Sequence, residues 1–288
     1  MEKMDKRKTH IRGFTLIELL VVIGIIGLLL SIVIPSLKMA KKKAEEIICR
    51  SNLKQWGVVF LTYAMENNNR FWIEYNSNMN PELQQGQWMP VLSPYYGEID
   101  KIRLCPSASK PPPDPRALGY GATFAHWGDS GDGGALMRGH KLTSSVDKNY
   151  GSYGINWWIN NVDPPKYVGW RYKPELHWRG PQMANTSTGR IPMISDCTWF
   201  GTNPENSFAD SSERIGVVTA NYWENIGSYS GEIWQNDISR LLINRHNKGI
   251  NFGFMDGSAG KVYLWDLLTL KWHRKSVPEQ ITIPWLPQ

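Results

Sequence analysis

The sequence lacks the short motifs that mark common catalytic centres. Its 288 residues contain no HExxH motif, no CxxC pair, no GxSxG turn and no glycine-rich loop of the kind that cradles phosphate. No internal repeat stands out, and cysteine is scarce, with three residues. An enzymatic function therefore has no support in the sequence, and we expect no catalytic residue, no metal ligand and no cofactor.

Strong hydrophobicity is confined to one stretch, which runs from Phe14 to Ile34 and contains one charged residue, Glu18. As a helix it would be about 30 Å long, which matches the hydrocarbon thickness of a bilayer. A lone carboxylate costs about 3 kcal/mol in the middle of a membrane. A plain anchor would not carry Glu18, so this residue indicates a second role for the helix.

The residues before this stretch are basic. Half of the formal net charge of +6 lies in residues 1–13, so the rest of the chain is only mildly basic and no specific nucleic-acid partner is predicted. The apolar run is longer than the core of a secretory signal peptide, and Ile34-Pro35-Ser36-Leu37 offers no small-residue cleavage site. The positive-inside rule places residues 1–12 in the cytoplasm and everything after Leu37 across the membrane.

The junction Gly13-Phe14-Thr15-Leu16-Ile17-Glu18 resembles the processing site of type IV prepilins and of the pseudopilins of type II secretion. In that family a dedicated peptidase cuts after the glycine and methylates the new N-terminus. The resemblance implies cleavage between Gly13 and Phe14, an N-methylated Phe14, and Glu18 as the fifth residue of the mature chain. Pro35 lies where many pilins have a helix-bending proline, so we expect it to bend the helix or to mark its exit from the membrane.

The same resemblance implies a structural subunit that is assembled into a type IV pilus or a type II secretion pseudopilus. Its partners would be the prepilin peptidase and N-methyltransferase, other pilin-like subunits, an inner-membrane assembly platform and the lipid bilayer. Before assembly it would span the inner membrane once, with the C-terminal domain periplasmic or extracellular. Pairing of Glu18 with the amino group of Phe14 on the next subunit would offset the cost of desolvation and set the stagger between subunits.

Beyond Pro35 the sequence predicts an amphipathic helix that ends near Glu66, before Asn67-Asn68-Asn69. Its apolar positions recur at near-helical spacing and predict one buried stripe. The stripe comprises Leu37, Ala40, Ala44, Ile47 or Ile48, Ser51, Trp56, Phe60 and Tyr63. The helix would therefore serve as a spine on which a globular domain packs.

After Arg70 the sequence changes to short aromatic runs broken by proline, glycine and asparagine, which favours an antiparallel β-sheet on the spine helix and an α+β, pilin-like fold. The expected strands are Phe71–Tyr75, Ser152–Trp158, Arg190–Asp196, Ile215–Thr219, Gly249–Met255 and Lys261–Trp265. The expected parts are a cleaved leader (1–13), a transmembrane half-helix (14–35), the spine helix (36–66) and a β-rich domain (67–288) with a hairpin over 246–265.

The alternation Ile250, Phe252, Phe254, followed by the turn pair Asp256-Gly257, predicts that hairpin. With His246, the segment resembles the His-x9-Asp-Gly signature of a prepilin-type family found mostly in planctomycetes and related bacteria. Three further segments resemble recurring pieces of that group: Asn52-Leu53-Lys54-Gln55, Cys105-Pro106-Ser107 and Tyr153-Gly154-Ile155-Asn156.

The role of the His246–Asp256 pair stays open at this point. A hydrogen bond between them would clamp the start of the hairpin. The alternative is metal binding, with Asp196 as a further ligand at the end of its predicted strand. Some pseudopilins hold a structural calcium in this region, although histidine is a poor ligand for a hard cation.

The three cysteines allow one disulfide and leave one thiol over. A Cys49–Cys105 bridge is chemically allowed outside the cytoplasm and would tie a proline-rich loop to the spine helix. We expect Cys197, beside a predicted strand end, to be a small buried residue.

The 14 tryptophans leave a second function open. Indoles on the surface would favour a membrane-tethered module that binds carbohydrate or another ligand, whereas buried indoles would favour a structural domain.

Overall fold

The structure is a computed structural model of the whole chain. It describes residues 14–72, 88–97, 100–110, 124, 127–128, 136–137, 140–141, 150–162, 174–184, 187–198, 201–202, 204, 237–241 and 243–278. The chain divides into two compact units, residues 1–44 and 45–288. The predicted strand Ile215–Thr219 and the predicted cleavage residue Gly13 lie outside the described residues.

The first helix, α1 (Leu16–Glu66), is 51 residues long and continues through Pro35, so this proline does not end it. The helix ends where the asparagine run predicts. Asn68 and Asn69 have left-handed φ values of 56° and 57°, and the Asn67 side chain donates a hydrogen bond to the carbonyl oxygen of Tyr63. Asparagine tolerates this backbone conformation better than most residues, which explains why the helix stops there.

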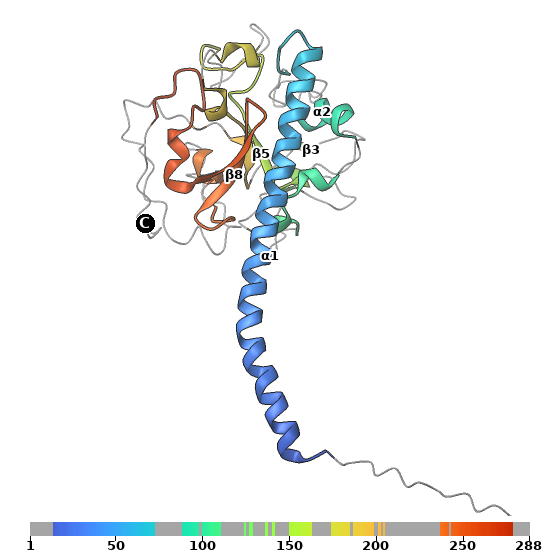
Figure 1. Ribbon diagram of the computed structural model, residues 1–288. Coiled ribbons are helices and arrows are strands. Elements are labelled where there is room, and N and C mark those ends of the chain that lie inside the picture. The colour runs from blue at the N-terminus through green and yellow to red at the C-terminus, as the bar shows by residue number, and fades with distance from the viewer. Residues whose placement is uncertain are drawn as a thin grey trace, which may run out of the picture. The chain divides into compact units, whose positions relative to one another are not determined.

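The second unit is built on a five-stranded sheet (Figure 1). Its order is β7 (Gly201–Thr202), β5 (Tyr153–Asn156), β6 (Pro192–Asp196), β8 (Gly249–Phe254) and β9 (Ala259–Tyr263). Four of the predicted strands are confirmed as β5, β6, β8 and β9, and β8–β9 is the predicted hairpin. Phe71 and Trp72 are not in a strand.

The sheet is mixed, not purely antiparallel as predicted. Neighbouring strands run antiparallel except for β5 and β7, which are parallel over Ile155–Gly201 and Asn156–Thr202. Strand β7 has two residues. A strand this short has no recognisable sequence pattern, so neither β7 nor its parallel pairing with β5 could be predicted.

Smaller elements complete the described part of the chain. They are α2 (Trp88–Tyr96), the two-residue strand pairs β1 (Trp127–Gly128) with β4 (Tyr150–Gly151) and β2 (Leu136–Met137) with β3 (His140–Lys141), and the 3-10 turns η2 (Asp100–Arg103), η3 (Pro106–Ala108), η5 (Pro181–Met183), η6 (Thr188–Arg190), η9 (Asp237–Leu241) and η10 (Leu264–Thr269).

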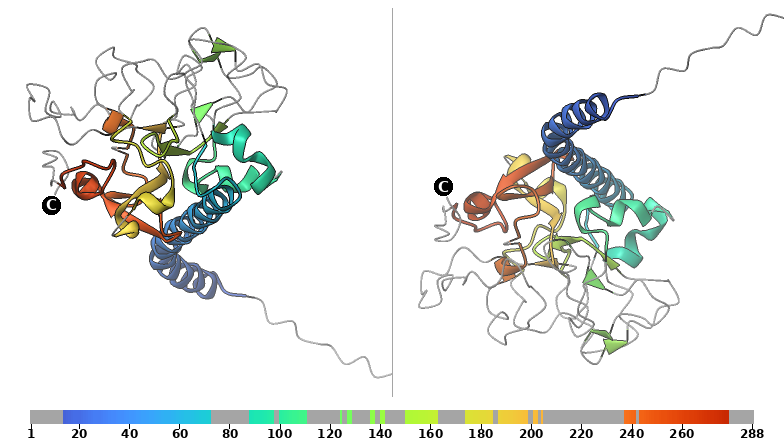
Figure 2. Two further views of the ribbon diagram at one scale, coloured as in Figure 1. Left: turned by 90° about the horizontal axis from the view of Figure 1, so that it is seen from above. Right: turned by 90° about the horizontal axis from the view of Figure 1, so that it is seen from below.

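The second half of α1 lies between the sheet and α2 (Figures 1 and 2). Its buried residues are Glu46, Cys49, Asn52, Leu53, Trp56, Gly57, Val59, Phe60 and Ala64. The predicted stripe is right at Trp56 and Phe60 but wrong at Ile47 and Ile48, which are 54% and 50% exposed. It is also wrong at the other exposed positions, Leu37, Ala40, Ala44 and Ser51. The buried face of the helix includes the polar residues Glu46 and Asn52. A stripe chosen from apolar residues alone therefore selects neighbouring positions that face outward.

Two glycines allow the hairpin to approach α1 closely. A Cβ atom on Gly253 of β8 would lie 2.8 Å from the carbonyl oxygen of Leu53, and one on Gly57 would lie 3.3 Å from the Cα atom of Gly257. Gly257 has a φ of 79°, which favours glycine in the turn of the hairpin. The hairpin turn and the helix therefore fit together through backbone contact.

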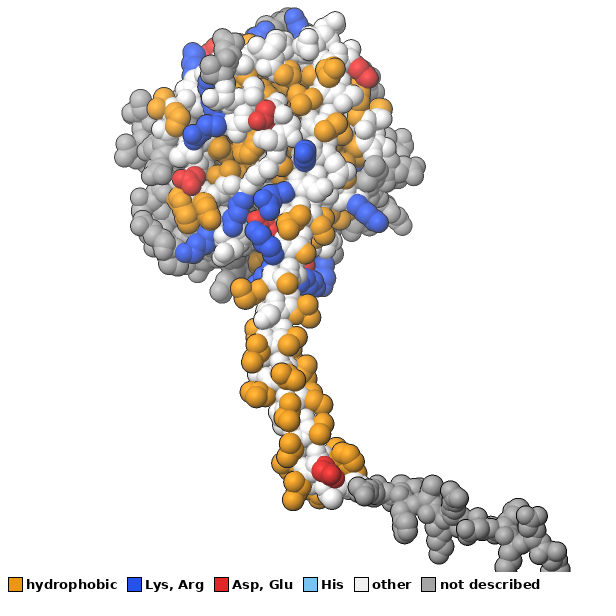
Figure 3. Space-filling view, viewed as in Figure 1, with side chains coloured by type: hydrophobic (Ala, Val, Ile, Leu, Met, Phe, Trp, Pro, Cys, Tyr) orange, Lys and Arg blue, Asp and Glu red, His pale blue; other side chains and the backbone are white. Residues whose placement is uncertain are grey.

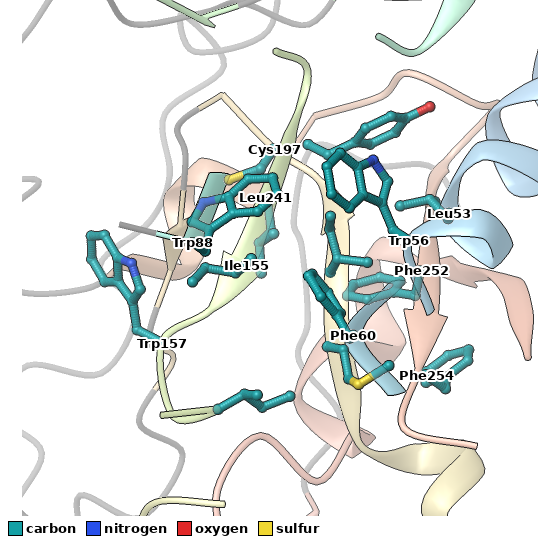
Figure 4. Packing of buried hydrophobic residues seen from close by; sticks show 14 of the residues in the cluster. Leu53, Trp56, Phe60, Trp88, Ile155, Trp157, Cys197, Leu241, Phe252 and Phe254 are labelled. Atoms are coloured by element: carbon teal, nitrogen blue, oxygen red, sulfur yellow. The ribbon is translucent and has the colours of Figure 1, made fainter. Parts of the chain in front are cut away.

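The core between α1, α2 and the sheet is aromatic (Figure 4). Trp56 contacts Trp88 and Tyr96 of α2 with ring centroids 5.1 and 4.7 Å apart, and its indole N–H donates to the carbonyl oxygen of Ile102 at 2.7 Å. Within the described residues, eight tryptophans are buried and Trp265 is partly buried. These indoles pack the domain, which favours the structural alternative over a carbohydrate-binding surface.

Candidate functional site

The start of α1 is closed by a reciprocal pair of side chains. The backbone N–H and the hydroxyl of Thr15 donate to Oε2 of Glu18 at 2.9 and 2.7 Å, and the backbone N–H of Glu18 donates to the Thr15 hydroxyl at 3.3 Å. This is the capping box of a helix N-terminus, with Thr15 at the cap and Glu18 three residues on. Glu18 thus has a partner within its own chain, in addition to the partner on a neighbouring subunit that the sequence predicts.

The helix that follows is apolar and exposed. From Phe14 to Ala44 every side chain is exposed, and the apolar ones include Leu16 at 80% and Leu28 at 65% (Figure 3). Among the described residues, α1 is the one helix that is long enough and apolar enough to cross a membrane. A surface of this kind is stable only in lipid or against other apolar helices.

A second site lies inside the globular unit, where four distant segments bring polar side chains together. They are Cys49 on α1, Cys105 just before η3, Asp196 at the end of β6, and His246 in the turn before β8. One ligand atom from each lies within 4.8 Å of the others, and all four residues are buried. The interior thus contains a compact cluster of two cysteines, one histidine and one aspartate.

Side-chain hydrogen bonds hold the backbone of the segment that carries Cys105. Cys105 is placed by Asn52, whose side-chain N–H groups donate to the carbonyl oxygens of Lys101 and Leu104 at 3.3 and 3.0 Å. The Cys105 N–H donates to the hydroxyl of Ser152. Since Asn52 lies on α1, the helix fixes the segment that carries Cys105.

His246 is placed by a tight turn. Asn247 and Lys248 both have positive φ values, 48° and 62°, and the His246 N–H donates to the carbonyl oxygen of Gly249 at 3.0 Å. The turn directs the imidazole toward Asp196, with 3.2 Å between Nε2 of His246 and Oδ2 of Asp196.

Asp196 is the centre of charge in the cluster. It accepts hydrogen bonds from Arg245 at 2.9 Å and from the backbone N–H of Asn251 at 2.8 Å. Burial alone would raise the pKa of Asp196, but the charges of His246 and Arg245 and these hydrogen bonds hold it well below its usual range. Burial would likewise lower the pKa of His246, yet the Asp196 charge outweighs burial and raises it to about 9. An ionised Asp196 is therefore paired with two buried cations.

The two thiols differ. Burial raises the pKa of Cys49 well above its ordinary value, and the neighbouring Cys105 and Asp196 add to this. Burial also acts to raise the pKa of Cys105, but hydrogen bonds from Cys49 and His246 and the charge of Arg245 bring it down to about 7. Tyr153 completes the surroundings, since its hydroxyl donates to the Cys49 sulfur at 3.4 Å. Cys105 is thus the thiol of the pair that ionises more easily.

This arrangement does not match a cysteine–histidine–aspartate catalytic triad. In a triad the base uses one ring nitrogen for the nucleophile and the other for the carboxylate. Here both Cys105, at 3.4 Å, and Asp196, at 3.2 Å, contact Nε2 of His246. The donor set instead suits a cation that takes sulfur, nitrogen and oxygen ligands.

The predicted His246–Asp256 clamp is wrong. Asp256 accepts from the backbone N–H and the hydroxyl of Ser258 at 2.9 and 2.6 Å, within the hairpin turn and exposed to solvent. The partner of His246 is Asp196, which the metal-binding alternative had named. Of the three signature residues, Asp256 and Gly257 shape the turn of the hairpin, whereas His246 belongs to the buried cluster.

The cysteine predictions divide in the same way. Cys49 and Cys105 meet in one place, but the structure holds them as free thiols and not as the predicted disulfide. Cys197 is buried, as expected for a small residue beside a strand end. Of the predicted processing residues, Phe14 is 71% exposed and Gly13 lies outside the described residues.

The chain carries the N-terminal motif of type IV pilin-like proteins and is similar to a type IV pilin. Residues 8–34 match the family described as the prokaryotic N-terminal methylation motif. The chain is also similar to the type IV wide pilus major component PilA4 of Thermus thermophilus, with 39% identity over 75 residues. That match covers 26% of this chain and 53% of the relative, so the chain spans about half the length of the curated relative it matches. No solved structure matches the chain significantly.

Proposed function

We propose that this chain is a structural subunit of a type IV pilus or a type II secretion pseudopilus, made as a precursor and cut between Gly13 and Phe14. The observation that carries the proposal is the exposed apolar helix, whose first part lies within the methylation motif at residues 8–34. Partners of this subunit would be the prepilin peptidase and N-methyltransferase, other pilin-like subunits and an inner-membrane assembly platform.

Before assembly the subunit spans the inner membrane once. The basic residues before Phe14 stay in the cytoplasm, and the globular unit lies on the far side. Extraction from the membrane then requires that the apolar side chains of α1 exchange lipid for the α1 helices of other subunits.

Glu18 has a second task in this proposal. Both hydrogen bonds from Thr15 end on Oε2, so the carboxylate can still receive the amino group of Phe14 from a neighbouring subunit. Such a pair neutralises the carboxylate in an apolar surrounding and fixes the axial stagger. Glu18 therefore both caps its own helix and positions the next one.

Two substitutions test whether the charge of Glu18 is needed for assembly. Glu18→Gln keeps a side chain that can close a capping box but removes the charge, whereas Glu18→Ala removes both. We expect both variants to be processed and to stay in the membrane, and neither to enter filaments. The measurement is the amount of subunit in sheared filaments relative to membranes. Wild-type assembly of Glu18→Gln would contradict the charge-pairing role.

A further inference from the structure

The buried cluster in the globular unit has the composition of a structural metal centre. Its four donor groups are the thiols of Cys49 and Cys105, the imidazole of His246 and the carboxylate of Asp196. We propose that these four residues bind one Zn²⁺ ion, which links α1 to the segment before η3, the end of β6 and the turn before β8. The proposal concerns the globular unit and does not depend on assembly into a filament.

The distances between donors fit a tetrahedral ion. With Zn–S bonds of about 2.3 Å and Zn–N or Zn–O bonds of about 2.0–2.1 Å, neighbouring ligand atoms in a tetrahedron lie roughly 3.3–3.8 Å apart. The structure gives 3.4 Å from the Cys105 sulfur to Nε2 of His246, and Oδ2 of Asp196 lies 3.6 Å from the Cys49 sulfur and 3.2 Å from Nε2. The donors need only small shifts to close on an ion.

The charges also balance. Two thiolates and one carboxylate around Zn²⁺ leave a single negative charge, and a buried charge is tolerated only when it is paired. Arg245 supplies the matching positive charge, since its guanidinium lies 2.9 Å from Asp196 and is itself fully buried. Arg245 also donates to the carbonyl oxygen of Ser152 at 2.8 Å, which fixes it beside the cluster.

The donor types select the class of metal. Calcium takes six to eight oxygen ligands, and this cluster offers one carboxylate together with two sulfurs and one nitrogen. Zinc prefers four ligands of this softer kind, and sites with four protein ligands are closed and structural. The structural calcium considered from the sequence is therefore not the ion that fits here.

The ion would join residues that are distant in sequence. Cys49 and Asp196 are 147 positions apart, and Cys105 and His246 are 141 apart. Since such a site forms only when these segments have come together, binding of the ion stabilises the folded globular unit. A Cys49–Cys105 disulfide would consume both sulfur ligands, so the metal centre and the predicted disulfide exclude each other.

The test uses the full mature chain, extracted in detergent with a reductant, stripped with a chelator and titrated with Zn²⁺. Metal content is measured by mass spectrometry, and thermal unfolding is followed with and without zinc. We expect about one zinc ion per chain and a higher Tm with zinc. With Co²⁺ in place of zinc, the chain should show thiolate-to-cobalt charge transfer and visible bands of tetrahedral cobalt.

Cys105→Ser is the test variant and Cys197→Ser the matched control, because both remove a buried thiol but only Cys105 belongs to the cluster. Cys197→Ser should bind zinc like the wild type, and Cys105→Ser should show a weaker charge-transfer band and a smaller zinc-dependent rise in Tm. A wild-type chain that takes up no zinc and shows no shift in Tm overturns the proposal, whether or not the variants fold. A Cys49–Cys105 disulfide in chain isolated without reductant overturns it as well.

Discussion

The imidazole nitrogen Nε2 of His246 lies 3.2 Å from Oδ2 of Asp196, the residue that ends β6. Both side chains are buried, and Arg245 contacts the other carboxylate oxygen of Asp196 at 2.9 Å. Three charged groups from two segments thus occupy the interior beside α1. This arrangement makes Asp196 the residue on which the polar interior depends.

Asp196→Ala should therefore be one of the most destabilising substitutions in the globular unit. It leaves Arg245 and His246 buried without their counter-ion, and breaking a buried ion pair in this way costs about 3–5 kcal/mol. Urea unfolding of the detergent-solubilised chain measures the change in the free energy of unfolding. Asp256→Ala is the control, because Asp256 is exposed and bonds only within its turn in the described part of the chain. It should cost about 1 kcal/mol or less, and equal losses for the two variants would refute the central position of Asp196.

Gly253→Ala should loosen the contact between the hairpin and α1. The new methyl group would lie 2.8 Å from the carbonyl oxygen of Leu53 and 3.0 Å from a methyl carbon of Ile194, so the backbone of the helix or of the strand must shift. Overpacking of this kind costs about 1–3 kcal/mol. Denaturant unfolding reports it.

The matched control for Gly253 is Gly260→Ala in the partner strand β9. The nearest atom to its new methyl group would be a ring carbon of Phe254 at 3.6 Å, an ordinary contact. Its stability should stay near that of the wild type. A Gly253→Ala chain as stable as the Gly260→Ala chain would contradict the close approach of β8 to α1.

The exposed apolar residues of α1 in the globular unit should matter for assembly and not for folding. Ile48 is 50% exposed although the residue after it, Cys49, is fully buried. In the proposed filament this face packs against α1 of another subunit, so Ile48→Asp should leave thermal stability unchanged within about 0.5 kcal/mol and reduce the subunit content of sheared filaments. Ile48→Leu keeps the apolar surface and should assemble normally. Normal assembly of Ile48→Asp would show that this face makes no contact needed for assembly.

The long helix and the hairpin could be predicted from the sequence because their signals are local. An unbroken apolar run, a closing asparagine run and a strict alternation up to Asp256-Gly257 each specify one element. The strands β5, β6, β8 and β9 were identified in this way. The two-residue strand β7 carries too little sequence for any period, and with it the parallel pairing was missed.

The buried cluster could be predicted only in part because its members are joined by tertiary contacts. Cys49 and Cys105 lie close together as the predicted bridge requires, and the metal-binding alternative names Asp196 as a further ligand beside His246. The choice between Asp196 and Asp256 depends on the left-handed turn at Asn247 and Lys248, which a spacing of nine residues does not reveal. Arg245 was missed although it precedes His246. A cation next to a histidine in an apolar surrounding is the signal that could have found it.

The phase of the spine helix shows the same limit. The buried face contains Glu46 and Asn52, and Asn52 bonds to the segment that ends at Cys105. A stripe chosen by hydrophobicity passes over these two residues and selects Ile47 and Ile48 instead. Polar residues that are buried for a specific partner are invisible to a periodicity argument.

The most direct test of the account is mass spectrometry of the N-terminus of the mature chain recovered from membranes. We predict a first residue of N-methylated Phe14, which would show that the precursor is cut after Gly13 and handled as a prepilin. A chain that keeps Met1, or one that is cut beyond Leu37, would contradict the proposal that this protein is a pilin-like subunit.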